Sequence, residues 1–201
     1  MAQLILLRHL KSQWNKENRF TGWTDIPLSK EGVASAKEIS EKIADFKIDK
    51  VYTSPLIRNK ETVSLVLKNL GQEDLPVFTD KALNERNYGK LQGLNKDEMK
   101  EKYGEEQVKL WRRSYNAAPP GGESLEEVVK RVVPFYKKYI KEDLKKGKNV
   151  LVVASHNSLR ALIKYIENIS DENIINVELP YAGIRKYEFD ESLKVKGAES
   201  I

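Results

Sequence analysis

The sequence predicts an α/β fold, in which helices pack against an open β-sheet. Two short, continuous apolar runs, residues 3–7 and 149–154, are typical of strands buried on both faces. Each run is followed within a few residues by a histidine and later by an amphipathic segment, which is the strand, loop and helix order of such a sheet. A chain of 201 residues suffices for one sizeable core but would leave two full-size domains marginal, so we expect one domain over residues 1–201.

The segments between the two runs continue the alternation of strand and helix. Ser29 predicts the N-cap of a helix that extends to about Ala44, and residues 50–53 predict a strand. The dipeptide at residues 54–55, Ser-Pro, begins another helix, which Gly71 ends. A predicted helix therefore follows each predicted strand.

Two further helices are indicated by their first residues. Asn95 and Ser124 are each followed three residues later by a glutamate, the spacing of a capping box, so we expect helices to begin there. The second helix is expected to run to Gly147, with a kink or an interruption at Pro134. Two prolines and two glycines at residues 119–122 predict a tight loop rather than a linker between domains.

The last part of the chain has weaker patterns. Residues 184–189 alternate apolar and charged side chains, which predicts a late edge strand. The tail from Leu193 has little apolar content, so we expect it to be mobile rather than firmly packed.

The composition favours a soluble, globular protein, with 40% apolar and 32% charged residues. Its net charge of +5 is compatible with an anionic partner, but lysines alternate with glutamates and no basic stripe or motif predicts nucleic-acid binding. No apolar stretch approaches the ~18 residues of a membrane span, so we expect no membrane partner. The absence of cysteine fits a reducing compartment, and we expect a cytoplasmic protein.

His9 and His156 are the only histidines, and each follows a predicted buried strand. Ligands of α/β sheets bind beyond the carboxyl ends of the strands, so the two histidines meet in one site if their strands are neighbours; two unrelated histidines are the alternative. Arg8 and Arg58 also lie near strand ends, and because guanidinium groups bind phosphate oxygens in pairs, the pattern favours phosphoryl over acyl transfer. The chain has only two histidines, and it lacks cysteine, a His-Glu-x-x-His motif and an aspartate-rich loop. These residues form no set of metal ligands, so we expect no bound metal.

Several motifs, in order along nearly the whole chain, closely resemble those of cofactor-dependent phosphoglycerate mutases of the histidine phosphatase superfamily. They are Leu6-Leu7-Arg8-His9, Arg19-Phe20-Thr21-Gly22-Trp23, Leu83-Asn84-Glu85-Arg86-Asn87-Tyr88-Gly89, Trp111-Arg112-Arg113 and Asn157-Ser158-Leu159-Arg160. The resemblance implies a three-layer α/β sandwich, with a mostly parallel central sheet flanked by helices.

The same resemblance implies the activity and the residues that carry it. The expected reaction is the interconversion of 3-phosphoglycerate and 2-phosphoglycerate, an isomerase step of glycolysis and gluconeogenesis, through a phosphohistidine primed by 2,3-bisphosphoglycerate and without a metal. His9 is implied as the nucleophile, Glu85 as the general acid and base, and His156, Arg8 and Arg58 as groups that stabilise the transferring phosphoryl group. The residues implied in substrate binding are Ser12, Asn15, Thr21, Gly22, Tyr88, Lys96, Arg112, Arg113 and Asn157.

Two other functions use the same residues. The first is a phosphomonoester hydrolase with His9 as its nucleophile, and the second is a weakly catalytic phosphoglycerate-binding module. Exclusion of water around a phosphohistidine decides between mutase and phosphatase.

Four departures from the family pattern affect these expectations. Leu10 replaces the usual glycine after the nucleophile, which predicts a bulky side chain near the phosphate. The family's His-Gly-Asn-Ser segment reads Ser155-His156-Asn-Ser here, and we assign the second-histidine role to His156, with a surface His156 and a role for Arg160 as the alternative. Tyr181 and its successor replace a threonine and a glycine. A long insertion before Glu123 is missing, so we expect a monomer or a weak homodimer.

Overall fold

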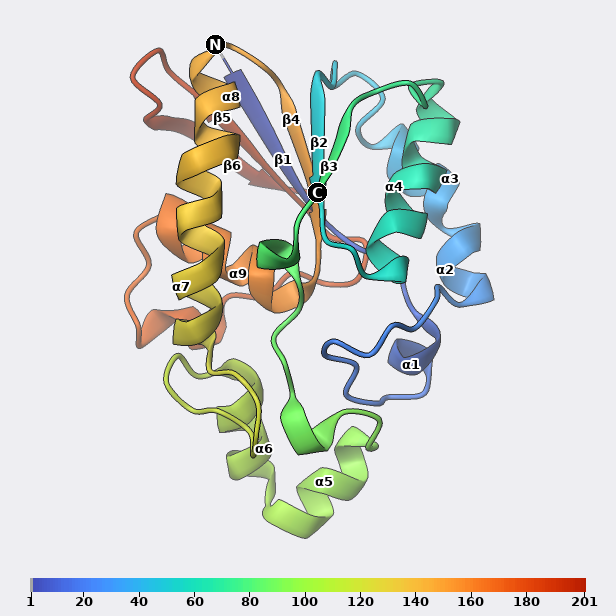
Figure 1. Ribbon diagram of the computed structural model, residues 1–201, viewed down its shortest axis with the longest axis vertical. Coiled ribbons are helices and arrows are strands. Elements are labelled where there is room, and N and C mark those ends of the chain that lie inside the picture. The colour runs from blue at the N-terminus through green and yellow to red at the C-terminus, as the bar shows by residue number, and fades with distance from the viewer. Residues whose placement is uncertain (1) are drawn as a thin grey trace.

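The computed structural model describes residues 2–201 and contains one six-stranded sheet, with helices on both of its faces (Figure 1). The strand order is β3-β2-β4-β1-β5-β6, and the first four strands of this order run parallel to one another. The strands are β1 (Ala2–Arg8), β2 (Lys50–Thr53), β3 (Val77–Thr79), β4 (Val150–Ala154), β5 (Ile184–Phe189) and β6 (Val195–Ser200). The predicted α/β sandwich with a mostly parallel sheet is confirmed.

The central strands are apolar throughout because both of their faces are covered. Successive side chains of a strand point to opposite faces, so Leu4 and Leu6 of β1 pack with one hydrophobic cluster, while Ile5 and Leu7 pack with another. The first cluster lies under α7 (Leu125–Phe135), α8 (Lys141–Lys145) and α9 (His156–Ile166), and the second lies under α3 (Ala36–Glu41) and α4 (Ile57–Leu70). The sheet is therefore the middle of three layers.

Most helix ends follow the residues that predicted them, but α4 (Ile57–Leu70) begins after Leu56 and not at the predicted Ser-Pro of residues 54–55. The side chain of Ser29 accepts from the Gly32 amide, Ser124 forms the expected capping box, and Gly71 ends its helix at φ +64°. The helices are α1 (Gln13–Lys16), α2 (Lys30–Ala34), α3 (Ala36–Glu41), α4 (Ile57–Leu70), α5 (Lys96–Tyr103), α6 (Glu105–Arg113), α7 (Leu125–Phe135), α8 (Lys141–Lys145) and α9 (His156–Ile166).

Two predicted helices have interruptions. The helix expected from Ser29 to Ala44 is divided at Ser35, whose hydroxyl donates to the Gly32 carbonyl, and its last residues form turns. The long helix after Ser124 continues past Pro134 but widens into a π-helical segment, Tyr136–Ile140, before α8. Pro134 has no amide hydrogen to donate within the helix, and the helix is perturbed just beyond it without ending.

The end of the chain departs from the prediction. Strand β5 has the predicted bounds but is not an edge, because it pairs with β1 on one side and β6 on the other. The tail expected to be mobile from Leu193 instead contains β6, which forms the edge of the sheet. Most β6 side chains are exposed, so backbone pairing with β5, not apolar burial, orders this segment.

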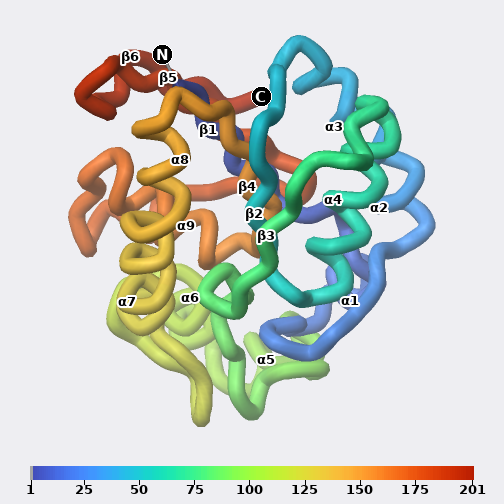
Figure 2. Tube along the Cα trace, turned by 45° about the horizontal axis from the view of Figure 1, so that its top comes forward, coloured from blue at the N-terminus to red at the C-terminus, as the bar shows by residue number. Residues whose placement is uncertain are grey.

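A smaller helical unit, α5 and α6, lies beyond the carboxyl ends of the parallel strands (Figures 1 and 2). It has its own small hydrophobic cluster, which includes Phe20, Tyr88 and Trp111. The loop at residues 119–122 is the predicted tight turn: Gly122 donates to the Pro119 carbonyl, and a side chain at Gly89 would collide with this loop. Within residues 2–201, no helix is both long enough and apolar enough to cross a bilayer.

Candidate active site

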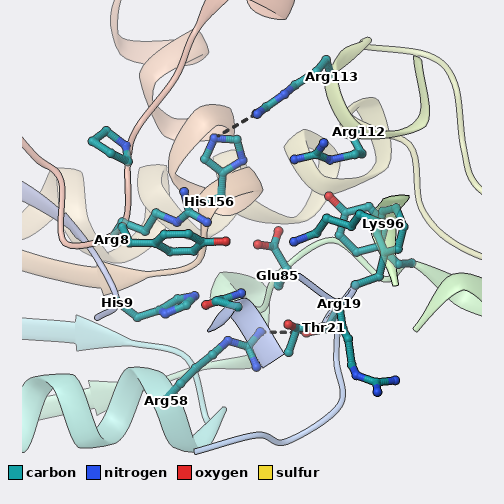
Figure 3. A pocket seen from close by; sticks show the side chains of 16 residues that line it. Arg8, His9, Arg19, Thr21, Arg58, Glu85, Lys96, Arg112, Arg113 and His156 are labelled. Carbon is teal, nitrogen blue, oxygen red and sulfur yellow. Dashed lines mark hydrogen bonds between the residues drawn. The ribbon is translucent and has the colours of Figure 1, made fainter. Parts of the chain in front are cut away.

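A cavity of about 300 Å³ lies between the carboxyl ends of β1, β2 and β4 and the α5–α6 unit (Figure 3). Its wall carries one carboxylate, Glu85, against six cationic side chains, so the cavity is suited to an anionic small molecule. The cationic residues are Arg8, Arg19, Arg58, Lys96, Arg112 and Arg113.

His9 follows the last residue of β1 and is held from both sides of that strand. Its amide donates to the Ala154 carbonyl at the end of β4, and its own carbonyl accepts from the Ala182 amide. The ring is 2% exposed, and Nδ1 lies 2.7 Å from the Leu10 carbonyl oxygen. A carbonyl can only accept, so the proton is on Nδ1, and Nε2 is left with a free lone pair.

The charge state of His9 is set by its surroundings. Burial, together with the charges of Arg58 and Arg8, lowers the pKa of His9 well below its usual value. The ring is therefore neutral at pH 7, which is the form in which imidazole acts as a nucleophile.

Arg58 lies in the first turn of α4, beside His9, and is fully buried. It donates to the carbonyls of Thr24 and Gly22, neutral groups that fix the guanidinium without cancelling its charge. Burial lowers the pKa of Arg58 to about 10, so it stays cationic at neutral pH. Its Nε, like that of Arg8, is buried without a hydrogen-bond partner within residues 2–201, and the oxygens of a bound anion are the groups that would satisfy it.

Arg8 is fixed by two contacts with the segment before β5. Its Nη1 donates to the Leu179 carbonyl at 2.7 Å, and its guanidinium carbon lies 3.9 Å from the centre of the Tyr181 ring. The cation is thereby aimed into the cavity beside His9 (Figure 3).

Glu85 reaches the cavity from the segment between β3 and α5 and is 7% exposed. One oxygen, Oε1, accepts from the backbone amides of Arg86 and Asn157, at 2.7 and 3.1 Å. Asn157 is in the first turn of α9, where unpaired amides and the helix dipole favour a carboxylate. Because both bonds reach Oε1, Oε2 is the oxygen available to exchange a proton with a ligand.

The adjacent residues Ser155 and His156 have different positions. His156 lines the cavity, whereas Ser155 is fully buried beneath it and its hydroxyl accepts from Asn59. Arg160 is also buried, donates to Asn157 and to two backbone carbonyls, and does not line the cavity. The geometry therefore favours His156, and not Ser155 or Arg160, for the role of the family's second histidine.

Lys96 is the first residue of α5 and faces the same space. Burial, reinforced by the nearby charges of Arg112 and Arg8, lowers the pKa of Lys96 to about 8. A bound anion would reverse this shift, because it stabilises the ammonium form.

Residues 4–196 match the family described as the histidine phosphatase superfamily, branch 1. The chain belongs to this superfamily. It is 45% identical to the 2,3-bisphosphoglycerate-dependent phosphoglycerate mutase of Cytophaga hutchinsonii, with 100% of this chain and 94% of that protein aligned. It is 46% identical to the protein of the same name from Treponema denticola, over 96% of this chain and 89% of that protein.

Solved structures of the superfamily share the fold. A phosphoglycerate mutase from Bacillus anthracis str. Sterne is 27% identical, with a TM-score of 0.82, over 100% of this chain and 92% of that one. A mycobacterial glucosyl-3-phosphoglycerate phosphatase superposes with a TM-score of 0.85 over 98% of this chain and 96% of that one, but at 22% identity this likeness concerns the fold alone.

Within this histidine phosphatase fold, twelve of the fourteen residues expected from the motifs line the cavity. The two exceptions are Ser12 and Asn157, which lie behind it. Ser12 caps α1 through the Asn15 amide, and Asn157 supports the site by holding Glu85 with its amide and Tyr88 with its side chain.

The expectation for Leu10 was wrong. Its side chain is fully buried in the hydrophobic cluster under α3 and α4, and it does not line the cavity. Its amide donates to Thr62 of α4, which turns the side chain away from the site. Leucine at this position therefore adds to the core and leaves the space beside His9 open.

The motifs missed four residues of the cavity wall: Arg19, Phe20, Pro180 and Tyr181. The first two lie inside the motif that includes Thr21, and its basic and aromatic side chains were the signal that could have found them. In the sequence, Tyr181 differs from the family pattern but carries no sign of a role in the site. Its contact with Arg8 depends on the pairing of β5 with β1, which the local sequence does not encode.

Proposed function

We propose that this protein is a phosphoglycerate mutase that interconverts 3-phosphoglycerate and 2-phosphoglycerate through a phosphorylated His9. The observation that carries the proposal is the neutral, buried His9, flanked by Arg8 and Arg58 in a cavity with one carboxylate. Relatives 45% and 46% identical over nearly the whole chain have the same activity in their names. Phosphoryl transfer requires positioning and charge neutralisation more than covalent help, and this cavity provides both.

The residues fit the bisphosphoglycerate that primes such an enzyme. The unpartnered Nε atoms of Arg8 and Arg58 and the excess of cations match a ligand that carries several negative charges. When bound, bisphosphoglycerate supplies the phosphoryl group that His9 accepts. Lys96, Arg112 and Arg113 lie on the α5–α6 side of the cavity and would hold the anionic groups that do not react.

The two transfers use the same residues in opposite directions. In the first, the 2-hydroxyl of 3-phosphoglycerate attacks the phosphorus on His9, the N–P bond breaks, and Glu85 accepts the hydroxyl proton. In the second, Nε2 of His9 attacks the 3-phosphate, the P–O bond to carbon 3 breaks, and Glu85 returns the proton to the departing oxygen. Arg8, Arg58 and His156 would stabilise the phosphoryl oxygens in both steps.

Several further properties belong to the same proposal. We propose that residues 1–201 act as one domain, that the reaction needs no metal, and that the protein works in the cytoplasm on small phosphoglycerates as a monomer or weak homodimer. The tight turn at residues 119–122, in place of a long insertion, supports a small subunit contact. Sedimentation at decreasing concentration tests this, and a dimer that persists at nanomolar protein would contradict it.

One assay separates the proposed function from its alternatives. Purified protein is incubated with 3-phosphoglycerate, with and without 2,3-bisphosphoglycerate, and the products are quantified. A mutase forms 2-phosphoglycerate and is stimulated by the bisphosphate. Release of inorganic phosphate as the main product would instead identify a phosphatase, and neither product would indicate a binding module.

A further inference from the structure

Glu178 contacts two residues of the cavity wall, although it is not itself part of that wall. Its Oε1 lies 2.6 Å from Nη2 of Arg113, and its Oε2 lies 3.3 Å from Nε2 of His156. Arg113 and His156 also meet, with Nη1 and Nε2 at 3.3 Å (Figure 3). One carboxylate from outside the cavity wall therefore lies against two residues of the candidate site.

The backbones on both sides of these contacts are held in place. Arg113 ends α6, and its carbonyl accepts from Arg160 at 2.8 Å. Glu178 directly precedes Leu179, which is buried and whose carbonyl accepts from Arg8. The Glu178 side chain itself is 52% exposed, so it can turn into solvent without moving these anchors.

The proton positions in this cluster follow from the charges around it. Burial and the charges of Arg8, Arg160, Arg113 and Arg112 lower the pKa of His156 well below its usual value. A neutral His156 accepts the Arg113 N–H at Nε2 and carries its own proton on Nδ1. Glu178 then receives a hydrogen bond from Arg113 alone, and the ion pair with Arg113 is the contact that holds it.

Arg113 differs in this respect from the arginines beside His9. Arg58 donates to backbone carbonyls, and Arg8 contacts a carbonyl and an aromatic ring, so their charges remain available to a phosphoryl group. Arg19 also pairs with a carboxylate, Glu17, but that partner is two residues away on the same exposed loop. The Arg113 ion pair instead joins two separate segments, the end of α6 and the residues before β5, through Nη2.

We propose that Glu178 is a positioning residue that occupies Arg113 in the ligand-free protein and gives way to the second anionic group of the substrate. The inference rests on the proposed function, since a phosphoglycerate carries a carboxylate in addition to its phosphate. The substrate carboxylate and the Glu178 carboxylate make the same fork-like contact with a guanidinium, so they compete for it. Glu178 thus lowers affinity for ligands with two anionic groups and leaves simple phosphates unaffected.

The competition between Glu178 and the substrate carboxylate is tested by measuring ligand binding to the Glu178→Gln variant by isothermal titration calorimetry. The ligands are 3-phosphoglycerate, glycerol 3-phosphate, which has the same carbon chain without the carboxylate, and inorganic phosphate. The dissociation constant for 3-phosphoglycerate is expected to fall roughly two- to fivefold, the size of a partly exposed ion pair. The constants for the other two ligands are expected to change no more than in Glu126→Gln, a control that removes an exposed glutamate paired with Lys130.

A second variant shows whether Glu178 acts through Arg113. In an Arg113→Gln background, Glu178→Gln is expected to have no further effect on 3-phosphoglycerate binding. Unchanged or weaker binding of 3-phosphoglycerate to the single variant would overturn the inference. A Glu178 that only orients Arg113 would favour substrate binding, so its removal would not tighten that binding. Equal tightening for all three ligands would overturn it too, since it would reflect net charge alone. If wild-type protein binds no phosphoglycerate, the proposed function fails and this inference fails with it.

Discussion

Nδ1 of His9 and the carbonyl oxygen of Leu10 lie 2.7 Å apart, within one residue of each other at the end of β1. This bond fixes the tautomer of the histidine and directs Nε2 to the ligand side. Burial lowers the pKa of this ring, and the charges of Arg58 and Arg8, which flank it, lower the pKa further and keep the ring neutral. The nucleophilic form is thus built into the strand end before any substrate arrives.

Phosphorylation is therefore expected at Nε2 of His9. Incubation with labelled 2,3-bisphosphoglycerate should give an acid-labile, base-stable label, as expected of a phosphorus–nitrogen bond. The His9→Asn variant should take up none, because it keeps the size and polarity of the side chain but has no imidazole. Label retained by His9→Asn would show that the nucleophile is another residue.

The burial of Leu10 predicts a cost in stability when it is shortened. Leu10→Ala is expected to lower the free energy of unfolding by about 2–5 kcal/mol, the usual range for a leucine removed from a packed core. Leu110→Ala is the matched control, since Leu110 is 42% exposed and its loss should cost less than about 0.5 kcal/mol. Denaturant unfolding measures both, and equal effects would mean that Leu10 does not pack as described.

The pKa of Lys96, about 8, predicts a loss of substrate affinity on the alkaline side. The ammonium form binds anions and predominates below that pH, so kcat/KM for 3-phosphoglycerate should fall as the pH rises through about 8. Lys96→Arg keeps its charge to a much higher pH, and its profile should stay flat in this range. A wild-type profile that is flat between pH 7 and 9 would contradict this assignment.

Chelation is expected to leave the activity intact. No group of three or more histidine, aspartate or glutamate side chains in residues 2–201 is arranged to hold a metal ion, and six cations already surround the ligand space. Turnover is measured before and after exhaustive treatment with EDTA. A loss that Mg²⁺ or Mn²⁺ restores would contradict the expectation.

The parts of the fold that could be predicted are those whose signals are local. β4 shows a continuous apolar run because both of its faces are covered, and Ser124 caps its helix with a glutamate three residues away. β6 has no such signal, because most of its side chains are exposed and show no apolar pattern. It forms because the turn after Asp190 brings the chain back beside β5, with which it pairs. An edge strand held by backbone bonds is invisible to a search for hydrophobic patterns.

The residues of the candidate site likewise include some that the sequence predicts and some that only the structure reveals. Arg8 and His9 could be placed because they directly follow a recognisable apolar run, and the carboxyl end of a buried parallel strand is where ligands bind. The contact of Arg113 with Glu178 could not be predicted, since two charged residues on distant segments give no sign of their pairing. Likewise, only the packing of Leu10 against α3 and α4 shows that its bulk is directed away from the ligand.

The positions of Ser155 and His156 lead to a comparison that tests the register of their loop. His156 lines the cavity and, in its neutral form, has one N–H to donate to the transferring oxygens. A bound phosphoryl dianion would raise the pKa of His156, so protonation would strengthen that bond when it is needed. Ser155 instead accepts from Asn59 beneath the site, which is a structural contact.

His156→Ala is accordingly expected to reduce kcat by about 10²–10³-fold, the usual loss when one donor to a developing charge is removed. Ser155→Ala should cost about 0.5–1.5 kcal/mol of stability, through the lost hydrogen bond with Asn59, and change kcat little. Thermal unfolding of both variants separates the two effects, because a folded His156→Ala protein with low turnover has lost chemistry, not structure. The opposite ranking of the two kcat values would place Ser155 in the site and His156 outside it, because only the residue that meets the phosphoryl group can control its transfer.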